Sequence, residues 1–143
     1  MRLSIFSDYA LRVLMHAALR TPELTTIDEV AHSFGISRNH LSKIVHQLSC
    51  HGFISTRRGI GGGFTLARPL KEITLGEVIR LTEGDDTVID CVTRKNEPCV
   101  IFPACRLKGV LAEAAQAFYE VLDNYTVHDL VRQRPAMREL LGI

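Results

Sequence analysis

Three of the four cysteines in this 143-residue chain lie close enough in sequence to bind one metal cofactor. Cys91 and Cys99 are separated by seven residues, and Cys99 and Cys105 by five. Structural zinc sites usually contain closely spaced cysteine pairs and four ligands, and this stretch has neither. An iron–sulfur cluster tolerates wider spacing because a loop can wrap around a larger cofactor. The spacing therefore favours an iron–sulfur cluster and leaves zinc open.

The residues around these cysteines also bear on their chemistry. Pro98 and Pro103 would stiffen the stretch, and Cys105 lies where a long helix is predicted to begin. The positive end of a helix favours a thiolate, which lowers the cost of placing an anionic ligand there. Three thiolates leave one iron position for a more labile ligand, which suits a sensor better than an electron carrier. Cys50 is far away in sequence, and we expect it to be a small buried hydrophobic residue.

The overall composition predicts a globular protein of the cytoplasm. Hydrophobic residues make up 46% of the chain and charged residues 23%, which is ordinary globular usage. No apolar run reaches the ~20 residues of a membrane span, and the N-terminus lacks a signal-peptide pattern. Thiols stay reduced in the cytoplasm, so four cysteines argue against a disulfide framework. Neither a Cys-x-x-Cys pair nor a dinucleotide-binding fingerprint occurs, so we do not expect an enzyme.

Positive charge is concentrated in the first half of the chain. From residue 30 to residue 71 there is no Asp or Glu, but there are six Lys or Arg residues and four histidines. An ordinary protein surface mixes both signs, whereas a surface that binds a polyanion excludes acids. Trp is absent and aromatic residues make up 6% of the chain, which argues against the stacking platforms that bind single strands. The pattern therefore indicates binding to a nucleic acid duplex.

Hydrophobic periodicity predicts a mainly α-helical fold with one small β-hairpin. A first helix is expected over residues 7–20. A capping box at Thr26 opens a second helix that ends near Gly35, and a third helix spans about residues 38–50. Two short helices joined by a glycine-containing turn are typical of the helix-turn-helix motif.

The third predicted helix carries residue types that read DNA. Its apolar residues repeat on one side of the helix, at Leu41, Ile44, Val45 and Leu48. The other side contains no acid and consists of basic and polar residues, namely Arg38, Asn39, Ser42, Lys43 and His46. Such side chains bond to phosphates and to base edges in the major groove. This side of the helix is therefore the candidate DNA-reading surface.

A glycine-rich hairpin directly follows that helix. Two stretches that alternate like strands, residues 53–56 and 64–67, flank a loop over residues 57–63 that contains four glycines. A phosphate-binding P-loop is excluded because its Gly-Lys-Ser/Thr ending and following helix are missing. We interpret the hairpin as the wing of a winged helix-turn-helix, lying along the DNA backbone or in the minor groove. The expected DNA contacts of the wing are Arg57, Arg58, Gly59, Gly61 and Gly62.

The second half of the chain is expected to hold the cofactor and to form a dimer. A capping box at Thr74 opens a short helix over residues 75–82, and residues 85–104 form an irregular loop. A long helix begins near Arg106, and its apolar stripe exceeds what the chain's own short elements can cover. A last short helix follows Thr126, and the tail gives no clear signal. The expected domains are a winged helix-turn-helix (1–83), a cysteine-rich loop (84–105) and a dimerisation helix with its tail (106–143).

The combined pattern resembles the iron–sulfur winged-helix transcription regulators of the NsrR/IscR family, and most of all its nitric-oxide-sensing branch. The resemblance covers essentially the whole chain. Its motifs are Phe6-Ser7-Asp8-Tyr9-Ala10-Leu11-Arg12, Ser37-Arg38-Asn39-His40-Leu41-Ser42-Lys43-Ile44, Arg57-Arg58-Gly59 with Gly61-Gly62-Gly63, Pro103-Ala104-Cys105-Arg106-Leu107-Lys108 and Leu122-Asp123-Asn124-Tyr125-Thr126. By this resemblance the protein is a homodimeric repressor that binds a palindromic operator in double-stranded DNA. The resemblance adds Ser37 and His40 to the expected DNA contacts.

The resemblance also implies a cofactor and its ligands. Cys91, Cys99 and Cys105 would ligate an iron–sulfur cluster, preferably [4Fe-4S] and otherwise [2Fe-2S]. Asp8 of the partner subunit would supply the fourth ligand, although an acid in the first turn of a helix is equally well explained by the helix dipole. In the IscR-like branch a histidine three residues after the last cysteine completes the site. This chain has Lys108 there, which argues against an IscR role.

The resemblance further implies that cluster nitrosylation or loss relieves DNA binding. The long helices would set the distance between the two recognition helices, and a changed distance no longer matches successive major grooves. Two alternatives stay open. One is a regulator that senses redox or iron–sulfur status through a [2Fe-2S] cluster. The other is a zinc-stabilised, constitutive DNA-binding protein.

Overall fold

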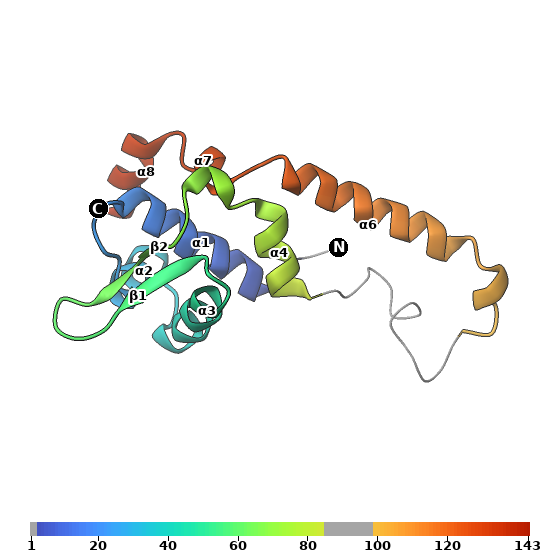
Figure 1. Ribbon diagram of the computed structural model, residues 1–143, viewed down its shortest axis with the longest axis horizontal. Helices are drawn as coiled ribbons and strands as arrows, with labels where there is room; N and C mark the ends of the chain where they lie inside the picture. The colour runs from blue at the N-terminus through green and yellow to red at the C-terminus, as the bar shows by residue number, and fades with distance from the viewer. Residues whose placement is uncertain (1–2, 85–98) are drawn as a thin grey trace.

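The N-terminal half folds into the three helices that the periodicity predicted. The computed structural model describes residues 3–84 and 99–143. Its first helices are α1 (Ile5–Arg20), α2 (Ile27–Phe34) and α3 (Arg38–Cys50), and α2 and α3 both pack against α1. Together with the hairpin that follows, they confirm a mainly α fold with a small β-hairpin (Figure 1).

Side-chain caps explain where these helices begin and end. The Oγ of Ser4 accepts a hydrogen bond from the backbone N–H of Ser7 at 3.2 Å, which starts α1 two residues earlier than predicted. Thr26 and Glu29 form both bonds of a capping box at 2.7 and 3.2 Å. Gly35 takes a left-handed φ of 64° and ends α2. Short-range chemistry therefore sets the turn between α2 and α3.

The wing is an antiparallel hairpin of β1 (Ile54–Arg57) and β2 (Gly63–Leu66). Each strand is displaced by one residue from its predicted range. The backbone N–H of Phe53 donates to Leu48 in α3 at 3.0 Å, so β1 begins only at the next residue. Phe64 and Thr25 exchange two backbone hydrogen bonds of 2.8 Å on the other edge of β2. This bridge joins β2, close to its loop end, to the segment before α2.

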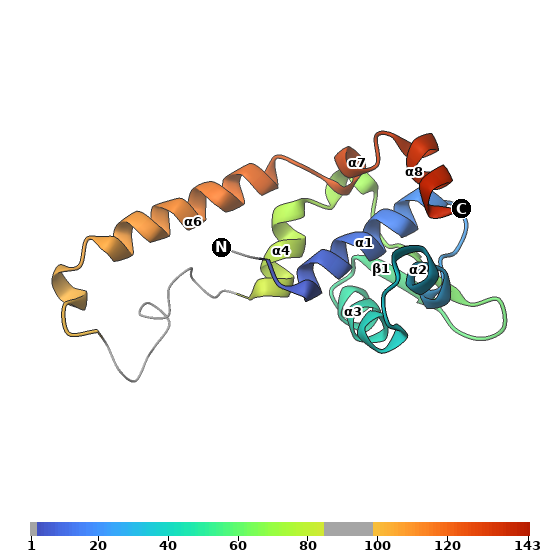
Figure 2. The same cartoon turned by 180° about the vertical axis from the view of Figure 1, so that it is seen from behind.

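The C-terminal elements extend from the head and then return to it. They are η1 (Leu70–Glu72), α4 (Leu75–Glu83), η2 (Phe102–Ala104), α6 (Leu107–Asp123), α7 (Val127–Leu130) and α8 (Arg134–Leu141). Figures 1 and 2 show α6 projecting from the head, with η2 at its far end. Both α7 and α8 pack against α1. α8 was not predicted, although Pro135 in its first turn and Gly142 after its last residue are ordinary helix signals.

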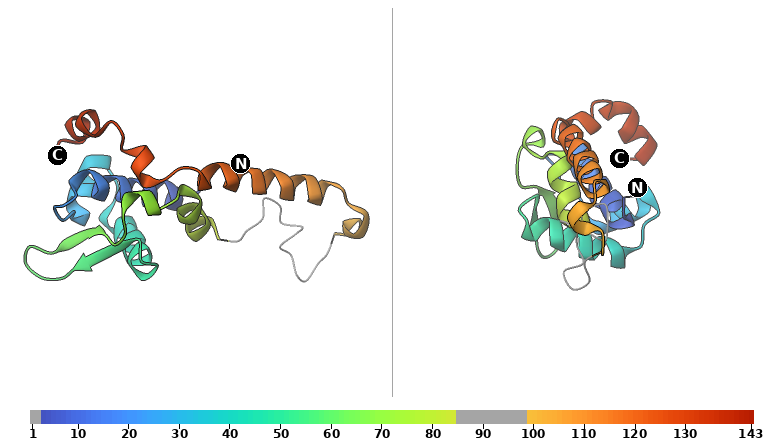
Figure 3. Two further views of the ribbon diagram at one scale, coloured as in Figure 1. Left: turned by 45° about the horizontal axis from the view of Figure 1, so that its top comes forward. Right: turned by 90° about the vertical axis from the view of Figure 1, so that its right-hand side faces the viewer.

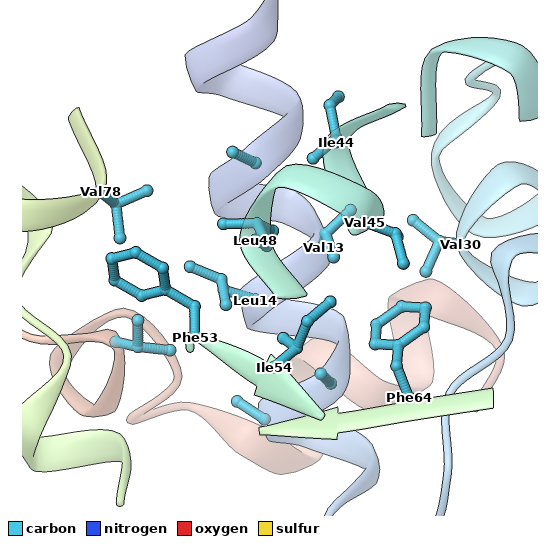
Figure 4. Close-up of a cluster of buried hydrophobic side chains, with 14 of the residues drawn as sticks. Val13, Leu14, Val30, Ile44, Val45, Leu48, Phe53, Ile54, Phe64 and Val78 are labelled. Atoms are coloured by element: carbon cyan, nitrogen blue, oxygen red, sulfur yellow. The ribbon is translucent and has the colours of Figure 1, made fainter. Parts of the chain in front are cut away.

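α1 is the central element of the hydrophobic core. Val13 and Leu14 are fully buried in it. In Figure 4 they lie between Phe53 on one side and Val30 on the other. Ile36, in the turn between α2 and α3, is 5% exposed and belongs to the same core. The head is therefore built around one helix that packs against α2, α3 and β2.

The described part of the chain is elongated because α6 continues well beyond the head, as Figure 3 shows from the side. Cys91 and most of the predicted cysteine-rich loop fall in residues 85–98, which lie outside the described residues. Within residues 3–84 and 99–143, every helix is too short or too polar to cross a membrane.

Candidate DNA-reading surface and metal-binding residues

The outer side of α3 presents the residues predicted to read DNA. All of them are exposed, namely Ser37, Arg38, Asn39, His40, Ser42, Lys43 and His46. The predicted inner stripe is buried, at Leu41, Ile44, Val45 and Leu48. Ser37 caps the helix by accepting from the N–H of His40 at 3.4 Å, and Ser42 donates to the carbonyl of Arg38 at 2.8 Å. Asn39 and Lys43 make no side-chain hydrogen bond within the described residues, so both are available to a ligand.

Arg38 is held by a neighbouring helix in this conformation. Its Nε lies 2.8 Å from Oδ1 of Asp28 in α2, and both side chains are largely exposed. Exposed ion pairs contribute only about 0–1 kcal/mol. A phosphate oxygen can therefore replace the carboxylate at little cost. Asp28 lies just before the acid-free stretch of residues 30–71, so the sequence pattern did not indicate this pair.

The wing presents two further cations on a tightly turned loop. Arg57 and Arg58 are exposed, and neither has an ion-pair partner in residues 3–84 or 99–143. Gly59 has a φ of 97° and Gly61 a φ of 72°, which are conformations that glycine tolerates best. A Cβ at Gly62 would lie 2.4 Å from the carbonyl oxygen of Arg57, so the tip has no room for a side chain there.

α3 and the wing lie on the same side of the head. Figure 1 shows the tip of the hairpin and the outer side of α3 at the lower edge of the molecule, and the view from behind in Figure 2 agrees. No acidic residue occurs between residues 30 and 71, which include both elements. The structure therefore brings the predicted reading helix and wing together as one basic surface.

Cys50 is exposed, and the prediction that it is buried was wrong. It is the last residue of α3 and lies two positions beyond Leu48, where the buried stripe ends. The helical register therefore turns it outward. Its Sγ lies 3.7 Å from Nε2 of His46, one turn earlier on the outer side of the helix.

Cys99 and Cys105 lie on either side of η2, the short turn before α6. Both are free thiols, and Cys99 is exposed while Cys105 is partly exposed. The N–H of Phe102 donates to the carbonyl of Cys99 at 2.8 Å, and the N–H of Cys105 donates to the carbonyl of Phe102 at 3.4 Å. These backbone bonds fold the segment back on itself. The structure thus brings two of the three predicted cysteine ligands to one end of α6, and Cys91 lies outside the described residues.

Lys108 braces this turn. Its Nζ donates to the carbonyl of Phe102 at 2.9 Å and lies 4.2 Å from the centre of the Phe102 ring. An ammonium group has donors only and no lone pair for a metal. Lys108 therefore stabilises the turn and cannot replace the histidine ligand that the resemblance assigns to this position in the IscR-like branch.

Asp8 lies far from Cys99 and Cys105 of its own chain. It is exposed in the first turn of α1, and its Oδ2 lies 3.0 Å from Arg12. All views place α1 in the head and η2 at the far end of α6 (Figures 1 to 3). Among the described residues, no three His, Cys, Asp or Glu side chains lie together in a way that could hold a metal ion. The single chain therefore does not bring Asp8 together with Cys99 and Cys105.

Glu83 joins the start of α1 to the end of α4, a contact that sequence analysis missed. Its Oε1 accepts from the N–H of Ser4 at 2.7 Å and from the hydroxyl of buried Ser7. Burial alone would raise the pKa of Glu83, but these hydrogen bonds hold that pKa below its ordinary value. The turn that carries Asp8 is thus tied to the last residue of α4, directly before the cysteine-rich loop. No local sequence pattern predicts hydrogen bonds between residues that are 76 or more positions apart.

α6 contacts the head on one side and leaves its apolar side uncovered. Arg80 in α4 bonds to both oxygens of Asp123 at 2.7 Å, and its guanidinium lies 4.5 Å from the centre of the Tyr119 ring. No described residue of α6 is buried. Its exposed large hydrophobic residues are Leu107, Val110 and Val121.

The comparisons agree with this architecture. A family model described as "Rrf2: Iron-dependent Transcriptional regulator" matches residues 3–133. The chain belongs to the Rrf2 family. The HTH-type transcriptional regulator NsrR of Shouchella clausii is 43% identical to it over 142 residues, which cover 99% of this chain and 95% of that protein. NsrR of Bacillus subtilis is 42% identical, with coverage of 99% and 97%.

A solved structure shows the same fold. The oxidized form of Staphylococcus aureus CymR matches with a TM-score of 0.72 and 28% identity, covering 92% of this chain and 97% of that one. As a member of the Rrf2 family, this protein is a transcriptional regulator and not an enzyme. DNA binding agrees with the exposed, acid-free side of α3 and with the wing.

Proposed function

We propose that this Rrf2-family protein is a nitric-oxide-responsive repressor that binds an iron–sulfur cluster and a palindromic DNA operator as a homodimer. The observation that carries the proposal is the pair of thiols, Cys99 and Cys105, beside η2 at the start of a helix with an uncovered apolar side. The family model is described as iron-dependent. The cytoplasm, where thiols stay reduced, is the compartment that suits this chemistry.

The donor set fits an iron–sulfur cluster. Thiolates are the usual ligands of such clusters, and η2 presents Cys99 and Cys105 at one end of the molecule without a disulfide. Cys91 would be the third ligand, and Asp8 of the partner subunit the fourth. Both [4Fe-4S] and [2Fe-2S] forms are compatible with three cysteines and one carboxylate. When bound, the cluster would supply iron that reacts with nitric oxide, so that nitrosylation or loss of the cluster is the signal.

The chain's own residues would turn that signal into a change of DNA affinity. Asp8 is held by Arg12 at 3.0 Å in the single chain, so its use by another subunit requires this weak pair to open. The same turn of α1 is tied to Glu83 at the end of α4. A ligand shared between subunits would therefore act directly on the helices that position α3.

The expected division of the chain describes functional units. Residues 1–83 would bind DNA, residues 84–105 would hold the cofactor, and residues 106–143 would form the dimer. These units do not each have a separate core, because Val127 and Val131 of the last segment are buried against α1.

Metal analysis of the anaerobically purified protein tests the cofactor. We expect iron and sulfide with visible absorption, and loss of both that absorption and operator binding in Cys99→Ala and Cys105→Ala. Cys50→Ala is the matched control, because Cys50 is also an exposed cysteine but lies at the end of α3. It should retain the cluster.

Each alternative has a distinct outcome. Stoichiometric zinc in a colourless protein would establish the zinc-stabilised regulator instead. A cluster that forms normally in Cys99→Ala would disprove the ligand set. If nitric oxide leaves DNA binding unchanged and oxygen or a reductant alters it, the signal is redox status and not nitric oxide.

A further inference from the structure

The tip of the wing presents an isolated hydrophobic side chain. The N–H of Gly62 donates to the carbonyl of Gly59 at 2.9 Å and closes a β-turn. Gly61 occupies the third position with the positive φ, 72°, that a type II turn requires. Ile60 occupies the second position, and its side chain is fully exposed.

The fold does not account for an isoleucine at this position. Turns of this kind favour proline or polar residues there, and a fully exposed side chain buries no surface that could stabilise the head. The other large exposed hydrophobic residues of the described chain lie in or next to α1, η2, α6 and α8. Among the described residues, Ile60 is thus the only one of them that lies in the wing.

The surroundings of Ile60 match one kind of ligand. Arg57 and Arg58 immediately precede the turn and lack ion-pair partners within the described residues. Close to the loop, β2 is held by the two 2.8 Å bonds between Thr25 and Phe64, so the tip projects from a fixed strand. Proteins that bend DNA place apolar side chains between base steps in the minor groove while neighbouring cations contact phosphates.

We propose that Ile60 is an apolar wedge that inserts between base pairs in the minor groove beside each half-site and bends the operator. This inference rests on the proposed DNA binding and adds to it a readout of DNA deformability. Pyrimidine–purine steps unstack most easily. The wing would therefore favour such a step without bonding to its bases.

The test uses the full-length homodimer and a duplex that the wild-type protein enriches from a pool of random-sequence duplexes. 2-Aminopurine, placed at successive positions in the flanking minor groove, reports unstacking by fluorescence, and end-to-end energy transfer reports bending. We expect Ile60→Ser to abolish both signals and to weaken binding about tenfold. Ile60→Leu, which keeps an apolar wedge, should retain them.

A matched variant separates the wedge from electrostatic attraction. Arg58→Ala should reduce the slope of log affinity against log salt by about one, whereas Ile60→Ser should leave that slope unchanged. Unchanged unstacking, bending and affinity in Ile60→Ser would overturn the wedge while leaving DNA binding in place. A change in the oligomeric state of the Ile60→Ser protein without DNA would also overturn the wedge, because it would assign Ile60 to a protein interface. If the wild-type protein enriches no duplex, the proposed function itself fails.

Discussion

The buried imidazole of His16 shows how one residue makes the stability of the head depend on pH. His16 is fully buried in α1, and its Nε2 lies 3.4 Å from the hydroxyl of Ser33 in α2. Its Nδ1 has no hydrogen-bond partner among the described residues. Burial lowers the pKa of His16 below its ordinary value, with a smaller opposing effect from Glu29 and a further lowering by Arg20.

This lowered pKa predicts that acid destabilises the protein. The unfolded chain binds a proton to His16 near pH 6.5, and the folded chain does so only at lower pH. Unfolding is therefore favoured as the pH falls below about 6.5, with a slope of up to about 1.4 kcal/mol per pH unit from this group. Urea denaturation of the protein from about pH 7.5 to pH 5.5 measures the slope.

Two histidine variants assign the effect. His16→Leu should lose this part of the pH dependence, whatever its stability at neutral pH. His51→Gln changes an exposed histidine at the end of α3 and should retain it. An equal slope in the wild-type protein and in His16→Leu would show that other groups cause the acid sensitivity.

At the scale of elements, the ion pair that joins α4 to α6 lies directly over a glycine. A Cβ at Gly76 in α4 would lie 1.8 Å from Oδ1 of Asp123 in α6 and 2.8 Å from its Cγ. The same carboxylate is bonded by Arg80 at 2.7 Å, and this bond lowers the pKa of Asp123. A methyl group at residue 76 would therefore displace the carboxylate of Asp123 from Arg80.

We predict that Gly76→Ala is close to neutral although alanine is the better helix former. In an open helix the change would stabilise by about 0.5–1 kcal/mol, but here the methyl group displaces Asp123 from Arg80, and loss of that exposed ion pair costs about 0–1 kcal/mol. Asp123→Ala alone should also cost about 0–1 kcal/mol. In that background Gly76→Ala should stabilise by about 0.5–1 kcal/mol, because the clashing carboxylate is gone. Additive effects of the two substitutions in urea denaturation would contradict the packing argument.

The elements near the DNA-reading surface could be predicted because their signals are local. Thr26, Gly35 and Ser37 act within four residues of themselves, and the apolar stripe of α3 is visible in its sequence. Contacts between distant segments could not be predicted in this way. The bridge from Thr25 to Phe64 and the bonds to Glu83 join segments whose proximity is set by tertiary packing alone.

At the scale of the whole molecule, the single chain does not cover the apolar stripe of α6. Its apolar stripe was read correctly from the sequence, but the structure leaves that stripe uncovered, with Leu107 and Val121 both more than half exposed. The tail behaves in the opposite way. No element was predicted there, yet Arg134 and Arg138 donate to the last carbonyls of α1 at 2.7 and 3.1 Å and close the head.

This contrast leads to a prediction about the dimer. Val121 lies on the uncovered stripe, 57% exposed, and about 24 Å along the helix from Cys105. Val121→Glu would place a charge from each subunit in an apolar contact, where an unpaired carboxylate is strongly disfavoured. We expect the dimer to dissociate at least about 100-fold more readily, measured by sedimentation equilibrium.

DNA binding should fall with the dimer. Two linked recognition helices bind paired half-sites with a high effective concentration, so the monomer should bind a palindromic duplex about 100-fold more weakly while still binding one half-site. Ala112→Glu adds the same charge to the other side of α6, at an exposed residue, and should leave both measurements unchanged. Because the proposed fourth ligand, Asp8, comes from the partner subunit, iron and sulfide content should fall together with the dimer in Val121→Glu and stay unchanged in Ala112→Glu. A dimeric Val121→Glu protein with full operator affinity would show that the uncovered stripe of α6 serves another partner.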